Sequence, residues 1–336
     1  MKKKIIILSA ILFFAFACFA LLPQQQSRAL EADRDIDRLV KIAEQGLAQA
    51  QFNLGVAYQQ GQGVKQDDTE AVKWFRRAAK QGFAEAQTNL GVMYAEGRGV
   101  AQDDAEAMEW YRKAAGQGDV KAQINLGMMY DVMQNKTEAA KWFRKAAKQG
   151  YADAQVNLGL MYAQGRGISQ DGAEAVKWLR KAAEQGHVLA QYSLGMAYQR
   201  GLGVKQDGAE AVKWYRKAAE QGYASAQYSL GLTYIEAQNY AEAVKWCRKA
   251  AEQGFALAQR GLGLMYAHAL GVAQDYAEAY FWLSLAAASG HEESIELRDT
   301  VAKELSQDEL VETQKRAREW QTREWQPKTA GETIVD

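Results

Sequence analysis

The chain has 336 residues, of which 48% are hydrophobic, and its 41 Lys and Arg balance 41 Asp and Glu. A zero net charge argues against nucleic acid as the main partner, because binding a phosphate backbone needs a surplus of basic side chains on one surface. Three histidines and two cysteines are too few for a metal or disulfide framework repeated along the chain. The 29 glycines stand beside only two prolines, which indicates that the glycines occupy fixed, helix-compatible places.

Residues 1–29 have the pattern of a signal peptide. Three lysines open the chain, residues 5–22 are almost entirely apolar, and residues 27–29 (Ser-Arg-Ala) fit a small-x-small cleavage site. We therefore expect export by a bacterial-type signal, cleavage after Ala29, and a periplasmic or secreted protein. Two alternatives stay open, because the apolar run is long enough for an uncleaved membrane anchor and Cys18 could carry a lipid.

One motif returns seven times at intervals of 36 or 32 residues. Each copy has a Leu-Gly pair, a Tyr three residues after the Gly, and a Trp further along. The seven glycines are Gly55, Gly91, Gly127, Gly159, Gly195, Gly231 and Gly263. The seven tryptophans are Trp74, Trp110, Trp142, Trp178, Trp214, Trp246 and Trp282. Such a period is typical of a repeat protein in which each copy is one small supersecondary unit.

Each repeat is predicted to form two antiparallel helices, and the first of them carries the Leu-Gly pair. In the first repeat, residues 48–60 place Ala50, Leu54 and Ala57 on one stripe at helical spacing. Gly55 lies on the same side, and its missing side chain lets a neighbouring helix approach closely.

The second helix of each repeat is predicted from its cap. In the first repeat it begins at Asp67, with Glu70 three residues later in a capping-box pattern, and it ends at Gly82. The two 32-residue repeats lack a four-residue Gly-rich segment between the helices, yet they keep the cap as Asn135 and Asn239. The fold therefore needs the cap more than it needs the loop.

A single helix pair of this length cannot bury its own apolar stripe, so neighbouring pairs must stack into a solenoid with one continuous core. We predict an all-α, right-handed α-solenoid with seven repeats over residues 48–291. Residues 30–47 are expected to form an N-terminal capping helix, residues 292–320 two closing helices, and residues 321–336 a flexible tail.

The repeated pattern carries a family resemblance. It reads Ala-x-Ala-Gln-x-x-Leu-Gly-x-x-Tyr, then Gly-x-Gly-Val-x-Gln-Asp, then Glu-Ala-x-x-Trp-x-Arg-Lys-Ala-Ala-x-Gln-Gly, and it resembles the Sel1-like repeat, a longer-looped relative of the tetratricopeptide repeat. The resemblance covers about residues 34–320. It implies an adaptor that holds partner proteins, often in the periplasm or at a cell envelope. Some secreted members with a disulfide in every repeat are described as weak β-lactam hydrolases, but this chain lacks their paired cysteines.

No pattern of catalytic residues is found in the sequence. It has neither Gly-x-Ser-x-Gly nor Ser-x-x-Lys, and its Gly-x-Gly loops lack the Lys-Ser/Thr of phosphate-binding loops. His187, His268 and His291 have no second His or Cys at ligand spacing. We therefore assign no catalytic step, no cofactor and no metal, and we expect Cys247 and the tryptophan series to be buried structural residues.

The candidate binding residues lie on the first helices, which by similarity to tetratricopeptide arrays line the concave surface. The candidates are Asn53, Asn89, Asn125, Asn157, Tyr192 and Tyr228. An Asn side chain both donates and accepts, so a row of them can pair with the backbone of an extended peptide. The tyrosines could supply anchors. The alternative, that each Asn braces its own helix or the adjoining one, stays equally open.

We therefore expect an exported, monomeric protein–protein interaction scaffold of the bacterial cell envelope, which binds a segment of another protein on its concave face. The alternative is an envelope hydrolase acting on β-lactams or peptidoglycan, kept only because of the family association. A third hypothesis is a structural tether, in which the array is a spacer behind an uncleaved anchor.

Overall fold

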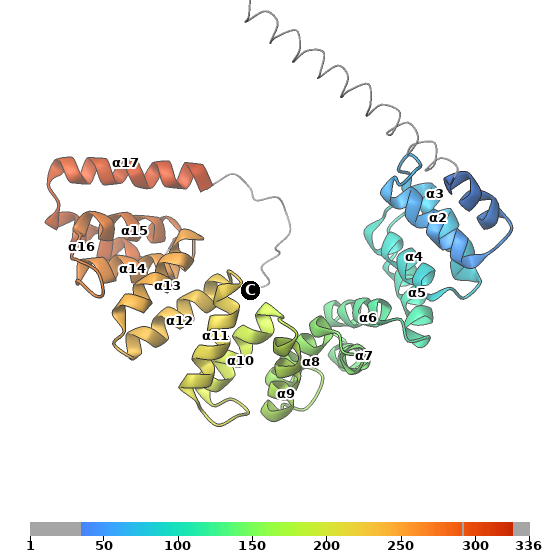
Figure 1. Ribbon diagram of the computed structural model, residues 1–336, viewed down its shortest axis with the longest axis horizontal. Coiled ribbons are helices and arrows are strands. Elements are labelled where there is room, and N and C mark those ends of the chain that lie inside the picture. Colours follow the sequence, from blue (N-terminus) through green and yellow to red (C-terminus); the bar gives the residue numbers. More distant parts are fainter. Residues whose placement is uncertain (1–34, 291, 325–336) are drawn as a thin grey trace, which may run out of the picture. The chain divides into compact units, whose positions relative to one another are not determined.

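The computed structural model describes residues 35–290 and 292–324, and all the regular secondary structure in these ranges is helical (Figure 1). It divides into two compact units, with the boundary between Ala154 and Gln155. The predicted all-α solenoid of antiparallel helix pairs is confirmed. The predictions for the signal peptide, for His291 and for residues 325–336 lie outside the described residues.

Seven repeats, each a pair of helices, follow one another along the described chain. The first helices are α2 (Ala48–Gln60), α4 (Ala84–Glu96), α6 (Val120–Val132), α8 (Ala152–Gln164), α10 (Val188–Arg200), α12 (Ala224–Glu236) and α14 (Ala256–Ala267). The second helices are α3 (Asp68–Lys80), α5 (Asp104–Gly116), α7 (Lys136–Lys148), α9 (Gly172–Glu184), α11 (Gly208–Glu220), α13 (Tyr240–Glu252) and α15 (Tyr276–Ala288). In the N-terminal unit, α3 packs between α2 and α4, and α5 packs between α4 and α6.

The second helices begin at the predicted caps, but the capping box is only half formed. The Asp67 carboxylate accepts hydrogen bonds from the backbone N–H groups of Thr69 (2.9 Å) and Glu70 (3.0 Å). The prediction that the Glu70 carboxylate would in turn accept from the backbone N–H of Asp67 was wrong. The Glu70 carboxylate accepts from Lys73 instead (2.6 Å), because the backbone N–H of Asp67 already donates to the carbonyl of Tyr58 (2.9 Å).

The glycine after each Leu permits a close helix contact, as predicted. A Cβ added at Gly55 would lie 2.6 Å from a ring carbon of Phe75 in α3. At the corresponding place in the sixth repeat, Gly231 faces Cys247, which is buried. Cys247 therefore fills a slot that other repeats fill with an aromatic or leucine side chain, as the sequence indicated.

The tryptophan series packs between repeats and is structural, as expected. Trp74 clusters with Ala43, Ala50 and Leu54 of the preceding elements. The buried members are Trp74, Trp178, Trp214, Trp246 and Trp282. Trp110 and Trp142 are half-buried, so their contribution to the core is smaller than the uniform pattern suggested.

Additional helices close the described part of the chain at both ends. Residues 35–44 form the expected capping helix. After the last repeat come α16 (Glu292–Val301), a short 3₁₀ helix (Ala302–Glu304) and α17 (Gln307–Glu324). The predicted end of the closing helices at residue 320 was wrong, since α17 continues to Glu324. The sequence has no Gly or Pro between the start of α17 at Gln307 and Pro327.

Candidate protein-binding surface

The asparagine row lies on the first helices as predicted, and some of its side chains are engaged inside the protein. Asn53 is exposed, whereas Asn89, Asn125 and Asn157 are half-buried. The Asn53 side-chain oxygen accepts a hydrogen bond from Gln49 on its own helix (3.1 Å). Asn157 also interacts within the chain.

Asn125 makes a contact between helices. Burial raises the pKa of the Tyr111 phenol in α5 to about 12, and the side chain of Asn125 is close enough to this phenol to offset part of the rise. Asn125 therefore braces the contact between α5 and α6. This contact supports the alternative interpretation of the asparagine row, in which each Asn braces its own helix or the adjoining one.

The two candidate tyrosines are half-buried in aromatic clusters. The ring centroid of Tyr192 lies 5.8 Å from that of Tyr215 and 5.2 Å from that of Tyr223. The ring of Tyr228 lies 5.4 Å from that of Phe255. Such ring pairs stabilise the helix packing, so that only the exposed edges of both tyrosines are free to contact a partner.

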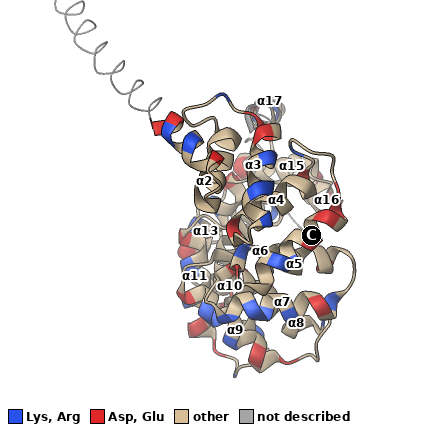
Figure 2. Ribbon diagram, turned by 90° about the vertical axis from the view of Figure 1, so that its right-hand side faces the viewer, with Lys and Arg blue, Asp and Glu red and all other residues tan. Residues whose placement is uncertain are grey.

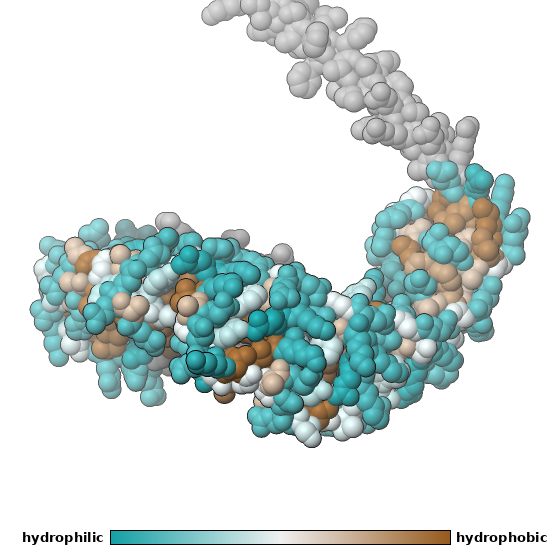
Figure 3. Space-filling model, turned by 60° about the horizontal axis from the view of Figure 1, so that its bottom comes forward, coloured by the Kyte–Doolittle hydropathy of each residue, from teal (hydrophilic) through white to brown (hydrophobic). Residues whose placement is uncertain are grey.

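A groove in the N-terminal unit was not predicted from the sequence. It has a volume of about 750 Å³ and lies between α5 and α6. Its wall includes Met128, Val132 and Met133, which are 54%, 80% and 62% exposed. Large apolar side chains with this exposure are typical of interaction surfaces, and methionines adapt to differently shaped partners. Figure 3 shows other apolar residues gathered on the surface of the N-terminal unit, over the helices at its N-terminal end rather than at α6. The signal in the sequence was the group of methionines at the end of the first helix of the first 32-residue repeat.

A second groove contains one of the predicted site residues. Asn53 and Val56 of α2 line it together with Ile36 and Leu39 of the capping helix, and it has a volume of about 510 Å³. The polar and apolar rows of the first helices therefore meet at a hollow in the N-terminal unit.

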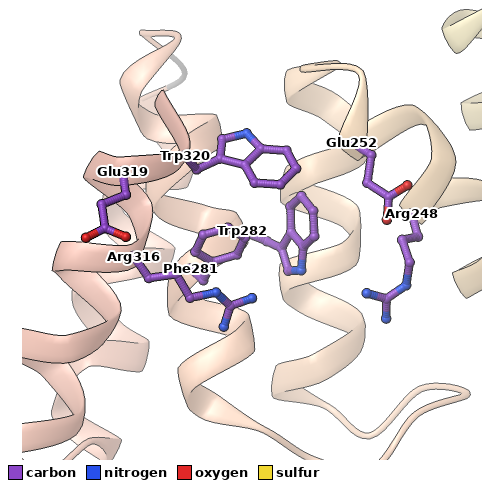
Figure 4. A pocket seen from close by; sticks show the side chains of 7 residues that line it. All are labelled: Arg248, Glu252, Phe281, Trp282, Arg316, Glu319 and Trp320. Carbon is purple, nitrogen blue, oxygen red and sulfur yellow. The ribbon is translucent and has the colours of Figure 1, made fainter. Parts of the chain in front are cut away.

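A smaller pocket of about 330 Å³ lies where α17 covers α15 (Figure 4). The ring of Trp320 packs edge-on against that of Trp282 at 5.9 Å. The guanidinium of Arg316 lies 3.9 Å from the centroid of Phe281 and forms an ion pair with Glu278 (2.5 Å). These contacts hold the closing helix in place, and we assign the pocket to packing.

The described residues contain no cluster of three or more His, Cys, Asp or Glu able to hold a metal ion. His187 accepts a hydrogen bond from the backbone of Ala190 at the start of α10 (3.4 Å), and His268 is exposed after α14. Burial raises the pKa of the Cys247 thiol to about 11, which keeps it protonated and unreactive at neutral pH.

The surface charge of the described residues is mixed, and Figure 2 shows basic and acidic residues interspersed along the helices. Over residues 35–290 and 292–324, no helix combines the length and the apolar character that crossing a bilayer requires.

Comparisons with known proteins agree with the geometry. The chain is 38% identical to the Sel1 repeat protein from Oxalobacter formigenes, with a TM-score of 0.66 over 80% of this chain and 81% of that chain. It is 30% identical to a protective antigen present in uropathogenic Escherichia coli strains and displaying an SLR fold, with a TM-score of 0.56 over 89% of this chain and 83% of that chain. No curated protein matches the chain.

The profile of the Sel1 repeat agrees with the helix pairs of the structure and with the seven repeats predicted from the sequence. It matches residues 48–83, 84–119, 120–151, 152–187, 188–223, 224–255 and 256–291. The chain therefore belongs to the Sel1 repeat family.

Proposed function

We propose that this chain is an exported protein–protein interaction scaffold of the bacterial cell envelope, which binds a segment of a partner protein through its first helices. Proteins built from Sel1 repeats generally bind other proteins. The observation that carries the proposal is the exposed apolar surface of these helices, of which Met128 and Leu232 are the most exposed members of their row.

The polar and apolar rows lie next to each other on each first helix. Asn125 and Met128 are three residues apart, so their side chains are neighbours on the helix surface, and the same holds for Asn53 and Val56. A partner segment could hydrogen-bond to side-chain amides of the polar row while its apolar side chains cover the methionine and valine. An uncharged row of this kind should keep its affinity at moderate salt.

Export rests on the sequence of residues 1–29. Amino-terminal sequencing of the chain recovered from an envelope fraction tests it, and the expected first residue is Leu30. An intact amino terminus in the membrane pellet would favour the anchor, and a lipid on Cys18 would favour lipidation. The proposal includes no catalytic step. Saturable turnover of nitrocefin by the purified chain would contradict it and would favour the hydrolase alternative.

The binding proposal is tested by capturing partners from envelope extract and identifying them by mass spectrometry. The double variant Asn53→Ala/Asn89→Ala leaves the Asn125 contact intact, so it should weaken capture without a large change in melting temperature. The matched control is Lys73→Ala/Glu109→Ala, which removes two exposed side chains of the second helices. Equal capture by both variants would move the site away from the asparagine row.

A further inference from the structure

We infer that the groove between α5 and α6 is a docking site for a turn of a partner protein in which an Arg stands between glycines and is followed by an aliphatic residue. The inference rests on the proposed function and names the class of partner. The preceding repeat of this chain supplies the template for the occupant, because there a loop with this chemistry fills the corresponding place.

The template is the loop of the second repeat, where it docks on the start of α3. The guanidinium of Arg98 donates to both carboxylate oxygens of Asp68, at 3.0 and 3.2 Å. Gly99 passes so close to the backbone carbonyl of Asp68 that an added Cβ would collide with it. Val100 packs against the cluster that contains Val72. One short segment thus pairs a cation with a carboxylate and an aliphatic side chain with the core.

The same docking occurs in the C-terminal unit. The loop glycine Gly203 lies against the backbone of Gly172 at the start of α9, and Gly271 lies against that of Tyr240 at the start of α13. In both cases an added Cβ would collide with the helix backbone. A full-length loop therefore covers the first residue of the second helix in the repeat before it.

The third repeat lacks this loop, so the start of α5 is left uncovered. Asp104 is the counterpart of Asp68, one 36-residue repeat later. Its side chain is exposed and has no hydrogen-bond or ion-pair partner within residues 35–290 and 292–324. Met108, the counterpart of Val72, lies beneath it in the groove. The place of the missing loop thus combines an unpaired carboxylate with an apolar surface.

The charges of the groove select a basic occupant. Asp104 stands next to Asp103, whose carboxylate caps α5, and two residues before Glu106, so the first turn of α5 is acidic. The basic residue at the other end, Arg112, already donates to the hydroxyl of Tyr130 (3.1 Å). An acidic segment would find repulsion at α5, whereas an Arg can form the bidentate pair that Arg98 forms with its carboxylate.

The second shortened repeat provides an internal control. It also leaves a helix start uncovered, because a Cβ added at Gly208 would meet nothing within 4 Å. This position has no carboxylate, and Glu236 and Ala237 stand where the third repeat has Val132 and Met133. Of the two shortened repeats, only the third therefore exposes a carboxylate beside an apolar surface, which is the combination that a basic and aliphatic turn would bind.

The test uses methionine-methyl NMR of the full chain and a head-to-tail cyclic peptide with the sequence of residues 96–102, Glu-Gly-Arg-Gly-Val-Ala-Gln. We expect saturable shifts of the Met128 and Met133 methyl signals, assigned by Met→Leu variants, and no saturable shift with a peptide that has Glu in place of Arg. Asp104→Asn should weaken binding about three- to tenfold, as loss of a partly exposed ion pair implies. The matched control Glu109→Gln removes an exposed carboxylate that pairs with Lys113, and it should bind normally.

A loop graft gives a second, independent measurement. Replacing residues 132–135 by the sequence of residues 96–103 restores a full-length loop, which should occupy the groove and abolish peptide binding. The same graft at residues 236–239 should leave binding unchanged. Because the restored loop copies a native contact, the first graft should fold with undiminished stability.

The inference is overturned if the methionine signals do not respond to millimolar peptide, if the Glu peptide binds equally, or if both grafts behave alike. Methionine shifts that depend on protein concentration without peptide would identify a second copy as the occupant and would also overturn it. Partner capture that depends on the asparagine row without peptide binding leaves the proposed function standing and removes only this inference. Peptide binding without any captured partner would remove the proposed function and leave the docking site at the groove standing.

Discussion

The side-chain amide of Gln117 donates a 2.8 Å hydrogen bond to the side-chain oxygen of Gln87. Gln87 is buried in α4, and its own amide donates to the carbonyl of Ala79 near the end of α3 (3.1 Å). One glutamine thus joins three successive helices and adds a second hydrogen bond to the Ala79 carbonyl, which also accepts from the backbone N–H of Gly82 (3.0 Å). The same side-chain pairs recur as Gln81–Gln51, Gln149–Gln123, Gln185–Gln155, Gln221–Gln191 and Gln253–Gln227.

Removing one glutamine of this series should be costly. Gln87→Leu should lower the free energy of unfolding by about 1–2 kcal/mol, because the hydrogen bonds of Gln87 to the Ala79 carbonyl and to the Gln117 side chain are both lost. Gln60→Leu, which changes an exposed glutamine at the end of a first helix, is the matched control and should be nearly neutral. Urea denaturation of both variants measures the difference. Equal midpoints would show that water replaces the lost hydrogen bonds.

The sequence predicted the fold well because its signals are local and are repeated seven times. The cap at Asp67, the close approach at Gly55 and the buried slot of Cys247 each follow from neighbouring residues or from comparison with other repeats. The glutamine pairs were missed because their members stand 26 or 30 residues apart. The sequence alone does not indicate which distant side chain a buried polar residue will bond.

The candidate site was harder to predict than the fold. The sequence places the asparagines on one row, but it cannot show that Asn125 meets Tyr111 across two helices. It also cannot show the groove at Met128, because the groove exists only where the missing loop would have packed on the start of α5. Only the packing of the second repeat's loop on α3 shows which part of α5 the missing loop of the third repeat leaves uncovered.

The loop contact predicts opposite effects for two Gly→Ala substitutions in the N-terminal unit. Gly99 has a φ of +66° and faces the Asp68 backbone, so Gly99→Ala should destabilise by at least about 2 kcal/mol. Gly116 ends α5, and an added Cβ there meets nothing within 4 Å. Gly116→Ala should stabilise by about 0.5–1 kcal/mol, the helix preference of Ala over Gly. Thermal unfolding of the two variants checks the signs, and shifts in the same direction would contradict the docking of the loop.

The buried thiol predicts a loss of stability at alkaline pH. Burial raises the pKa of Cys247 from its ordinary value of 9.0 to about 11. The unfolded chain releases this proton first, so the stabilisation is complete below pH 9 and is lost as pH rises towards 11. The free energy of unfolding should fall by about 2–3 kcal/mol over this window, at about 1.4 kcal/mol for each unit of pKa.

Cys247→Ala should lack this part of the pH dependence, although it keeps the contribution of other titrating groups. Iodoacetamide should label Cys247 only after unfolding, as read by mass spectrometry of the peptide that contains it. Rapid labelling of the folded chain at pH 8, or an identical pH profile for the variant, would show that the thiol is accessible.

The tryptophan series should show graded rather than uniform costs on truncation. Trp282 is buried, and its indole N–H donates to the Glu278 carboxylate (3.1 Å). Trp282→Ala should therefore cost about 3–5 kcal/mol, the range for emptying a large aromatic site. Trp142 is half-buried, with the Lys145 ammonium 3.8 Å from its ring centroid. Trp142→Ala should cost only about 2 kcal/mol, for partial loss of burial and of the cation–π contact.

Hydrogen exchange separates the local from the global consequences of the two tryptophan variants. Because each repeat couples mainly to its neighbours, Trp142→Ala should lower protection around residues 120–150, while protection around residues 48–80 changes little. Trp282→Ala should loosen α17 as well, since the Trp320 ring packs on that of Trp282. Lys145→Gln removes the cation while keeping the indole in place, so it isolates the cation–π part of the Trp142 effect. A Trp142→Ala cost as large as that of Trp282→Ala would mean that the exposed part of the Trp142 ring is covered in solution, and the basic helix α7 would then be the surface to search for the partner that covers it.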